Sequence, residues 1–189
     1  AVTQGDCSNT HVLMEIYRLR GVKTVAFNFP YGRDPTMMRR SIDLLLEYFG
    51  VDEGSAESMR VRLNRIRAKL ARIDQMTWQD GVVTGFENHL LLVSSSDFES
   101  DPDVFEAKLD RFIIEAGVRE PMNQAVRLGL IGIPPILDGL YQHIEEHGAR
   151  VVYNEVQRQF CMPFGGETLA EQYLNYTYPY DIGPRIDDI

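Results

Sequence analysis

The hydrophobic and polar positions between Val126 and Glu155 predict a strand, a helix and a second strand. Residues 126–131 and 151–153 are short apolar runs, and Gly148 stands where the intervening helix should end. The apolar residues between the runs fall on one helical stripe: Leu137, Leu140, Tyr141 and Ile144. A strand, a helix of about three turns and a strand in this order form a right-handed βαβ unit, so the strands should be parallel. Ligands of parallel sheets gather at the carboxyl ends of the strands.

A similar order of elements occurs near the start of the chain. A helical pattern ends at Gly21, and an apolar run over residues 22–29 follows it. The expected apolar face of that helix consists of Val12, Leu13, Ile16, Tyr17 and Leu19. The repeat predicts an α/β protein with two parallel βαβ halves joined by a helical section. The expected boundaries are residues 1–35 for the first half, 36–124 for the helical section and 125–189 for the second half.

The middle of the chain should be mostly helical. Thr77 and Asp80 have the spacing of a capping box, so we expect a new helix to begin at Thr77. Asp101 before Pro102 is another typical helix start. The hydrophobic periodicity predicts helices over residues 36–48, 58–76, 77–92 and 102–117, and a short one over residues 167–176.

Composition and charge narrow the classes of protein. The formal net charge of -9 argues against general nucleic-acid binding, although residues 1–76 contain more basic than acidic side chains. No apolar run is long enough to span a bilayer and no signal peptide opens the chain, so we expect no membrane partner. Two distant cysteines form no disulfide framework, which favours a reducing cytoplasm. Both ends of the sequence are abrupt, so we expect a piece of a longer protein.

Two familiar motifs are present only in incomplete form. The loop from Gly129 to Pro135 follows a strand, but its prolines remove the amides that a dinucleotide phosphate would need. His143 and His147 have the spacing of an inverted zinc-protease motif, but the sequence shows no third ligand. A histidine just before a helix-ending glycine is also favoured by the helix dipole. We therefore expect neither a nicotinamide or flavin site nor a zinc hydrolase.

One predicted helix is strongly basic along residues 60–72, where no acidic residue occurs. Its cations are Arg60, Arg62, Arg65, Arg67, Lys69 and Arg72. Such a face could bind the phosphates of a nucleotide-like ligand or of coenzyme A. The alternative is a solvated face that docks on the acidic second half of the chain.

Cys7 is the most suggestive single residue, because its loop lies between a strand and a helix N-terminus. A helix N-terminus favours the thiolate, which is the form that attacks or binds metal. The alternative is a small loop residue without chemistry. Asp6, Ser8 and Asn9 would line a crevice beside Cys7, and Pro134, Pro135 and Glu155 would form its opposite wall. Cys161 follows the strand of the second unit, so its sulfur could face the same crevice.

Four motifs resemble the 2-hydroxyacyl-CoA dehydratase D-component family, relatives of the benzoyl-CoA reductase subunits. They are Gly5-Asp-Cys-Ser-Asn-Thr10, Gly85-Phe-Glu-Asn88, Gly132-Ile-Pro-Pro135 running into Gly148-Ala-Arg-Val-Val-Tyr-Asn-Glu155, and Tyr173-Leu-Asn-Tyr-Thr-Tyr-Pro-Tyr180. The resemblance covers most of the chain. It implies Rossmann-like (flavodoxin-like) lobes around a helical section.

The resemblance also implies a [4Fe-4S] cluster on cysteines between the lobes. An ATP-dependent activator protein would pass one electron to the cluster, and an acyl-CoA substrate would then lose water. Cys7 is similar to one cluster cysteine, whereas Cys161 does not clearly match a family cysteine. The other ligands would come from the remainder of the parent chain, and a second dehydratase subunit would be a further partner. We therefore expect the isolated chain to hold no cluster and to be inactive. The alternatives are a non-catalytic domain that binds CoA or the activator, and a plain α/β binding module.

Overall fold

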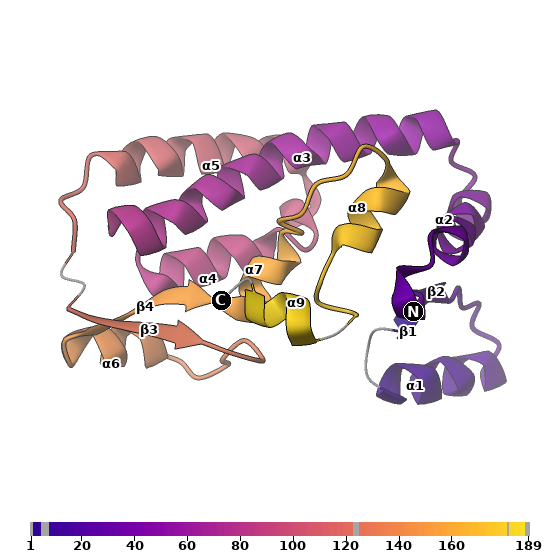
Figure 1. The fold of residues 1–189 in the computed structure, drawn as a ribbon, viewed down its shortest axis with the longest axis horizontal. Coiled ribbons are helices and arrows are strands. Elements are labelled where there is room, and N and C mark those ends of the chain that lie inside the picture. The colour runs from indigo at the N-terminus through magenta and orange to yellow at the C-terminus, as the bar shows by residue number, and fades with distance from the viewer. Residues whose placement is uncertain (1, 5–7, 123–124, 181, 188–189) are drawn as a thin grey trace. The chain divides into compact units, whose positions relative to one another are not determined.

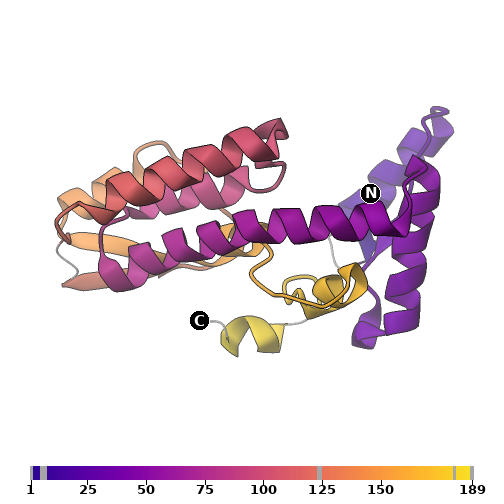
Figure 2. The same cartoon turned by 90° about the horizontal axis from the view of Figure 1, so that it is seen from above.

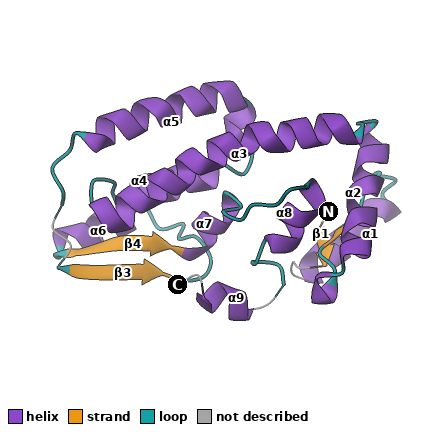
Figure 3. Ribbon diagram, turned by 45° about the horizontal axis from the view of Figure 1, so that its top comes forward, coloured by secondary structure: helices purple, strands orange, loops and turns teal. Residues whose placement is uncertain are grey.

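The computed structural model describes residues 2–4, 8–122, 125–180 and 182–187. Its contacts divide the chain into two units, Ala1–Val61 with Phe164–Ile189, and Arg62–Pro163. Helices dominate both units, and each unit contains one pair of parallel strands (Figure 3). The predicted α/β class is therefore confirmed.

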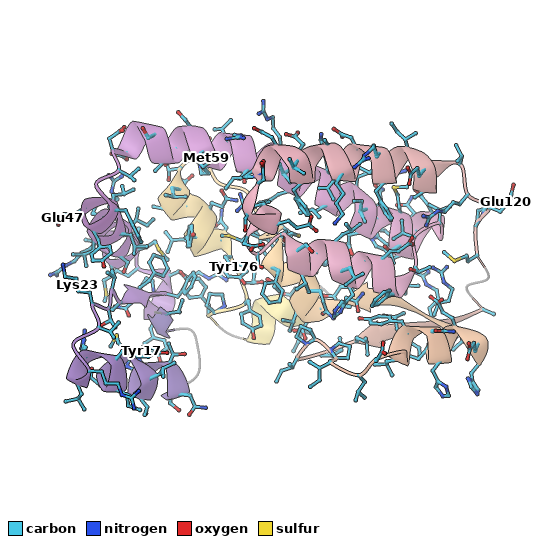
Figure 4. All side chains as sticks on the ribbon, turned by 180° about the vertical axis from the view of Figure 1, so that it is seen from behind. Tyr17, Lys23, Glu47, Met59, Glu120 and Tyr176 are labelled. Carbon is cyan, nitrogen blue, oxygen red and sulfur yellow. The ribbon has the colours of Figure 1, made fainter. Side chains whose placement is uncertain are left out.

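The first unit is built around a small parallel pair and a group of aromatic side chains. Strand β1 (Val2–Gln4) pairs with β2 (Phe27–Asn28), and the helices are α1 (Ser8–Leu19), α2 (Pro35–Phe49), the start of α3 (Glu53–Gln75), α8 (Leu169–Asn175) and α9 (Ile182–Asp187). Asp34 begins α2 by accepting hydrogen bonds from the amides of Thr36 and Met37. Tyr176, which is labelled in Figure 4, belongs to the aromatic group of this unit. Its ring lies 5.8 Å from the ring of Phe29, between centroids, in a core that also contains Met38 and Ile42.

Helix α1 differs from its prediction in what it buries. The residues expected to form its buried face are exposed, and Met14 is its buried residue. Strand β2 is also much shorter than the run of residues 22–29 predicted. A sheet of two such short strands offers α1 little surface to pack against, because a stable hydrophobic face needs more strands.

The second unit packs three helices over a parallel strand pair. It contains the rest of α3, a π-helical turn (Met76–Asp80), α4 (Gly85–Ser94), α5 (Pro102–Gly117), β3 (Val126–Leu130), α6 (Leu140–Glu146), β4 (Ala149–Asn154) and α7 (Glu155–Phe160). Helices α3, α4 and α5 lie side by side (Figures 1 and 2), and their shared core includes Ile66, Leu70, Leu92, Phe105 and Leu109. Both α4 and α6 pack against β4.

The parallel pairing predicted between residues 126 and 155 is confirmed. Val126 is opposite Ala149 and Leu130 is opposite Asn154, with a register shift between Leu128 and Gly129. The helix between the strands is shorter than predicted, because it begins after Gly139, whose φ of 72° is left-handed. Leu137 therefore lies in the preceding loop and is exposed, which corrects its predicted place on the helical stripe.

The predicted helix start at Thr77 is wrong. Thr77 is fully buried, and its hydroxyl donates a hydrogen bond to the carbonyl of Ile73 at 2.9 Å, so it continues the helical path of α3. Gly81 ends that path with a φ of 71°. The capping box is instead formed by Thr84 and Glu87, each of which accepts a hydrogen bond from the other's backbone amide.

Candidate functional site at the carboxyl end of β4

Buried polar side chains gather where β4 ends and α7 begins, in the second unit. Asn154 and Gln157 are fully buried and Glu155 is almost so. The carboxyl end of a parallel strand is where α/β proteins place ligand sites. Buried polar groups are costly unless they are hydrogen-bonded, so the partners of these side chains define what the region can do.

Two asparagines connect the end of β4 to α3 and α4. Asn154 donates hydrogen bonds to the carbonyl oxygen of Gly85 at 3.1 Å and to Oδ1 of Asn88 at 2.9 Å. Asn88 in turn donates to Asp74 Oδ1 and to Thr77 Oγ1, both at 3.1 Å. The other carboxylate oxygen of Asp74 is 2.9 Å from Nε of Arg158 in an ion pair. The carboxylate therefore anchors one end of the network as an acceptor.

The other end of the network consists of a tyrosine, a histidine and a glutamine. The hydroxyl of Tyr141 is 2.8 Å from Oδ1 of Asn154 and 3.0 Å from Nδ1 of His89. The amide of Gln157 is 3.0 Å from the same Nδ1. Burial raises the pKa of Tyr141 to about 12 and lowers the pKa of His89. At neutral pH the tyrosine is therefore a neutral phenol and the imidazole is uncharged.

A cavity of about 260 Å³ opens beside this end of the network. It is lined by Thr84, Phe86, His89, Pro135, Leu137, Asp138, Gly139, Leu140, Tyr141, Gln142 and Glu145. Burial raises the pKa of Glu145 against the opposing charge of Arg150. No lysine or arginine is among the lining residues that the structure describes. The cavity is therefore suited to a ligand without negative charge.

Gly85 brings the first turn of α4 against β4 and so holds Asn88 and His89 in place. A Cβ at this position would lie 2.6 Å from the carbonyl oxygen of Val151 and 3.0 Å from Cδ1 of Tyr141. The backbone would have to shift, because real Cβ contacts are not that short. Only glycine therefore allows this approach of helix and strand.

We expect Gly85→Ala to lower the free energy of unfolding by about 2 kcal/mol, because the strand backbone cannot move away from the added methyl group without losing packing. Urea denaturation followed by the fluorescence of Trp78, the single tryptophan, measures the effect. The control is Gly117→Ala at the end of α5, where a Cβ would meet nothing within 4 Å. Equal midpoints for the two variants would contradict the close approach.

The predicted crevice residues lie in different parts of the structure. Asp6 and Cys7 lie outside the described residues, and Ser8 and Asn9 begin α1 in the first unit. Pro134, Pro135 and Glu155 belong to the second unit.

Two of the three residues predicted to form the opposite wall of the crevice, Pro135 and Glu155, lie in the region of the candidate site. Oε2 of Glu155 accepts a hydrogen bond from the amide of Gly132 at 2.7 Å, which fastens the loop before the two prolines to the end of β4. Pro135 also lines the cavity. The Gly-Ile-Pro-Pro loop is therefore joined to the end of β4 at Gly132 and reaches the cavity at Pro135.

Cys161 is part of the hydrophobic core of the second unit. Its side chain is buried, and its Sγ lies 3.0 Å from the carbonyl oxygen of Arg158. Burial, reinforced by the charge of Asp74, raises the pKa of this thiol to about 12. Without a metal ion the thiol is therefore protonated at neutral pH, and it packs among the apolar side chains of the core.

The donor set of this chain does not fit an iron-sulfur cluster by itself. Such a cluster needs about four ligands, mostly cysteine thiolates. The chain has two cysteines, and one of them, Cys161, is buried in the hydrophobic core. In the described ranges, no group of three or more His, Cys, Asp or Glu side chains could hold a metal ion.

The basic face of α3 is largely paired with carboxylates. Lys69 lies 2.9 Å from Glu106 and 2.7 Å from Asp110 of α5, and Arg62 forms an ion pair with Asp103 of the same helix. Arg60 pairs with Glu57 and Arg72 with Asp80. These contacts agree with the alternative that the basic helix face packs against acidic residues of the second half of the chain. They leave less positive charge available to bind the phosphates of coenzyme A.

Sequence reasoning missed the polar centre of the site. Asn88, His89, Asn154 and Gln157 were not among the predicted site residues. A signal was available for Asn154, because a polar residue at the carboxyl end of a predicted buried strand marks the usual ligand edge. His89 and Gln157 give no comparable signal, since each follows an ordinary helical pattern.

The fold and the site define a mixed α/β protein with a polar cavity beyond the end of a parallel strand pair. In the part of the chain that the structure describes, no helix is both long and apolar enough to cross a membrane. The model of the 2-hydroxyglutaryl-CoA dehydratase D-component family matches residues 2–189, and the chain belongs to that family. Searches of curated proteins and of solved structures gave no match.

Proposed function

We propose that this chain is part of a 2-hydroxyacyl-CoA dehydratase-like enzyme, which removes water from an acyl-CoA after an ATP-dependent activator has supplied one electron. The observation that carries the proposal is the match of the family model to residues 2–189. A partner subunit, or further parts of a longer protein, would complete the enzyme. The parallel strand pairs support Rossmann-like halves, one around β1 and β2 and the other around β3 and β4.

In this proposal Cys7 supplies one thiolate to the [4Fe-4S] cluster of the whole enzyme. Asp6, Ser8 and Asn9 would flank it, and Pro134, Pro135 and Glu155 would contribute a second wall. The cluster needs about four ligands, which is more than the two cysteines of this chain could supply, so the remaining ligands would come from outside these 189 residues. The chain alone would then hold no complete cluster and would not catalyse the reaction.

The experiment is an anaerobic reconstitution with iron and sulfide, followed by analysis of bound iron. For the 189-residue chain we expect far fewer than the roughly four irons per chain that a cubane contains. In the full-length parent protein, Cys7→Ser should remove most of the cluster's visible absorbance. The matched control is Cys161→Ala, which should retain it. A full complement of iron on the isolated chain, or an unchanged absorbance in Cys7→Ser, would overturn the cluster assignment.

A further inference from the structure

The directions of the hydrogen bonds in the buried network are fixed from its acidic end. The ion-paired carboxylate of Asp74 can only accept, so Asn88 turns its amino group to Asp74 and its oxygen to Asn154. Asn154 must then donate to Asn88 and to the carbonyl of Gly85. Its own oxygen is left for Tyr141, whose only hydroxyl proton is used in that bond.

This order assigns the tautomer of His89. Because the hydroxyl proton of Tyr141 is directed at Asn154, the hydroxyl oxygen can only accept a hydrogen bond at its 3.0 Å contact with Nδ1 of His89. Nδ1 must therefore carry the ring proton, and the lone pair of the neutral imidazole lies on Nε2. The opposite tautomer would place two acceptors face to face in a buried site, which is unfavourable.

Gln157 agrees with this assignment once its amide is turned. With its nitrogen directed at Nδ1 of His89, the buried Oε1 of Gln157 has no hydrogen-bond partner. With the amide reversed, the oxygen takes the 3.0 Å position and shares the Nδ1 proton with Tyr141, at the cost of the long 3.4 Å hydrogen bond from the Gln157 amide nitrogen to the Tyr141 oxygen. Every contact around Nδ1 is then attractive.

Nε2 is consequently the ring nitrogen of His89 that remains for a ligand in the cavity. The neighbouring walls are aromatic or aliphatic and come from Phe86, Tyr141, Pro135 and Leu140. The acidic residues Asp138 and Glu145 also line the cavity, without a lysine or arginine among the described lining residues. Such surroundings disfavour phosphates and carboxylates, and the apolar walls favour a partly apolar group.

We propose that this cavity binds an organic group without negative charge that has a ring-sized apolar body and a hydroxyl or N–H donor, and that Nε2 of His89 accepts the ligand's hydrogen bond. The site lies within the second unit and does not depend on the proposed dehydratase function. Its selectivity comes from one half-buried acceptor, Nε2 of His89, which is left without a proton because the hydrogen bonds leading from Asp74 place the ring proton on Nδ1. A ligand that fills the cavity without a donor would leave that acceptor unsatisfied.

Phenol and its methyl ether, anisole, are the probes that separate these features, because they share a ring and differ in the donor. In nitrogen-15 NMR, the free protein should show His89 with its proton on Nδ1. Phenol should shift the Nε2 resonance with millimolar affinity, and anisole should bind about tenfold more weakly. Inorganic phosphate should leave the His89 signals in place.

Two variants complete the test. His89→Phe should lower phenol affinity about tenfold, to the level of anisole, because the ring is kept and the acceptor is lost. The control His147→Phe alters an exposed histidine and should leave phenol affinity unchanged. A proton on Nε2, equal affinities of phenol and anisole, or no response of His89 to either probe would each overturn the proposal. These readouts use the wild-type chain, so they stand even if His89→Phe does not fold.

Discussion

Replacing Asn154 with leucine is expected to lower the free energy of unfolding of the second unit by about 4 kcal/mol. The leucine is similar in size, so it leaves little cavity but removes every hydrogen bond of the amide. The groups that lose their partner are Asn88 Oδ1, the carbonyl of Gly85 and the hydroxyl of Tyr141. Each is buried or partly buried, so water can replace the lost bonds only at a cost.

Urea denaturation monitored by Trp78 fluorescence measures this loss, since Trp78 belongs to the same unit. The matched control is Gln142→Leu, where an exposed amide that bonds to Glu146 is exchanged for the same side chain. Its cost should be below about 0.5 kcal/mol. A loss of less than about 1 kcal/mol for Asn154→Leu would mean that the network relaxes and contributes little to stability.

The elements that sequence predicted well are those with a strong local signal at both ends. Helix α5 begins after Asp101 at Pro102 and ends at Gly117, as expected, because the cap and the proline fix its start. The strands β3 and β4 follow from two apolar runs with glycines beside them. For α5 and β4 local propensity and burial favour the same structure, whereas β3 is largely exposed and follows from its apolar pattern alone.

The predicted start of α4 at Thr77 was wrong because the sequence contains two possible capping boxes. In each of them a threonine is followed three residues later by an acidic residue. Thr77 with Asp80 and Thr84 with Glu87 have the same spacing, so local chemistry alone does not choose between them. Gly81 lies between the two pairs and has a left-handed backbone conformation, which ends the helical turn that follows α3. The new helix therefore begins at the second pair. The hydroxyl of Thr77 is buried and accepts a hydrogen bond from the side-chain amide of Asn88. This bond joins residues that are not local neighbours in the sequence, so no local pattern predicts it.

The sequence predicted the parallel strand that ends at residue 154, but not the buried side chains that gather beside it. Glu155 bonds to the loop before the two prolines, and Pro135 lines the neighbouring cavity. The network itself joins side chains from α3, α4, α6 and α7, and a buried asparagine looks the same in a sequence as a solvated one. The proposed role of Cys7 depends on family membership, since its loop lies outside the described residues.

Replacing Phe105 with alanine is expected to lower the free energy of unfolding by about 4 kcal/mol, because the ring is fully buried and its removal leaves a cavity. The ring lies 6.0 Å from that of Phe98, between centroids, in the core shared by α3, α4 and α5. Val104→Ala changes its exposed neighbour and should cost less than about 0.5 kcal/mol in the same urea titration. Since a domain is stable by only about 5–15 kcal/mol, Phe105→Ala should move the unfolding midpoint to a clearly lower urea concentration. A pair of variants with equal midpoints would mean that the three helices do not share one close-packed core.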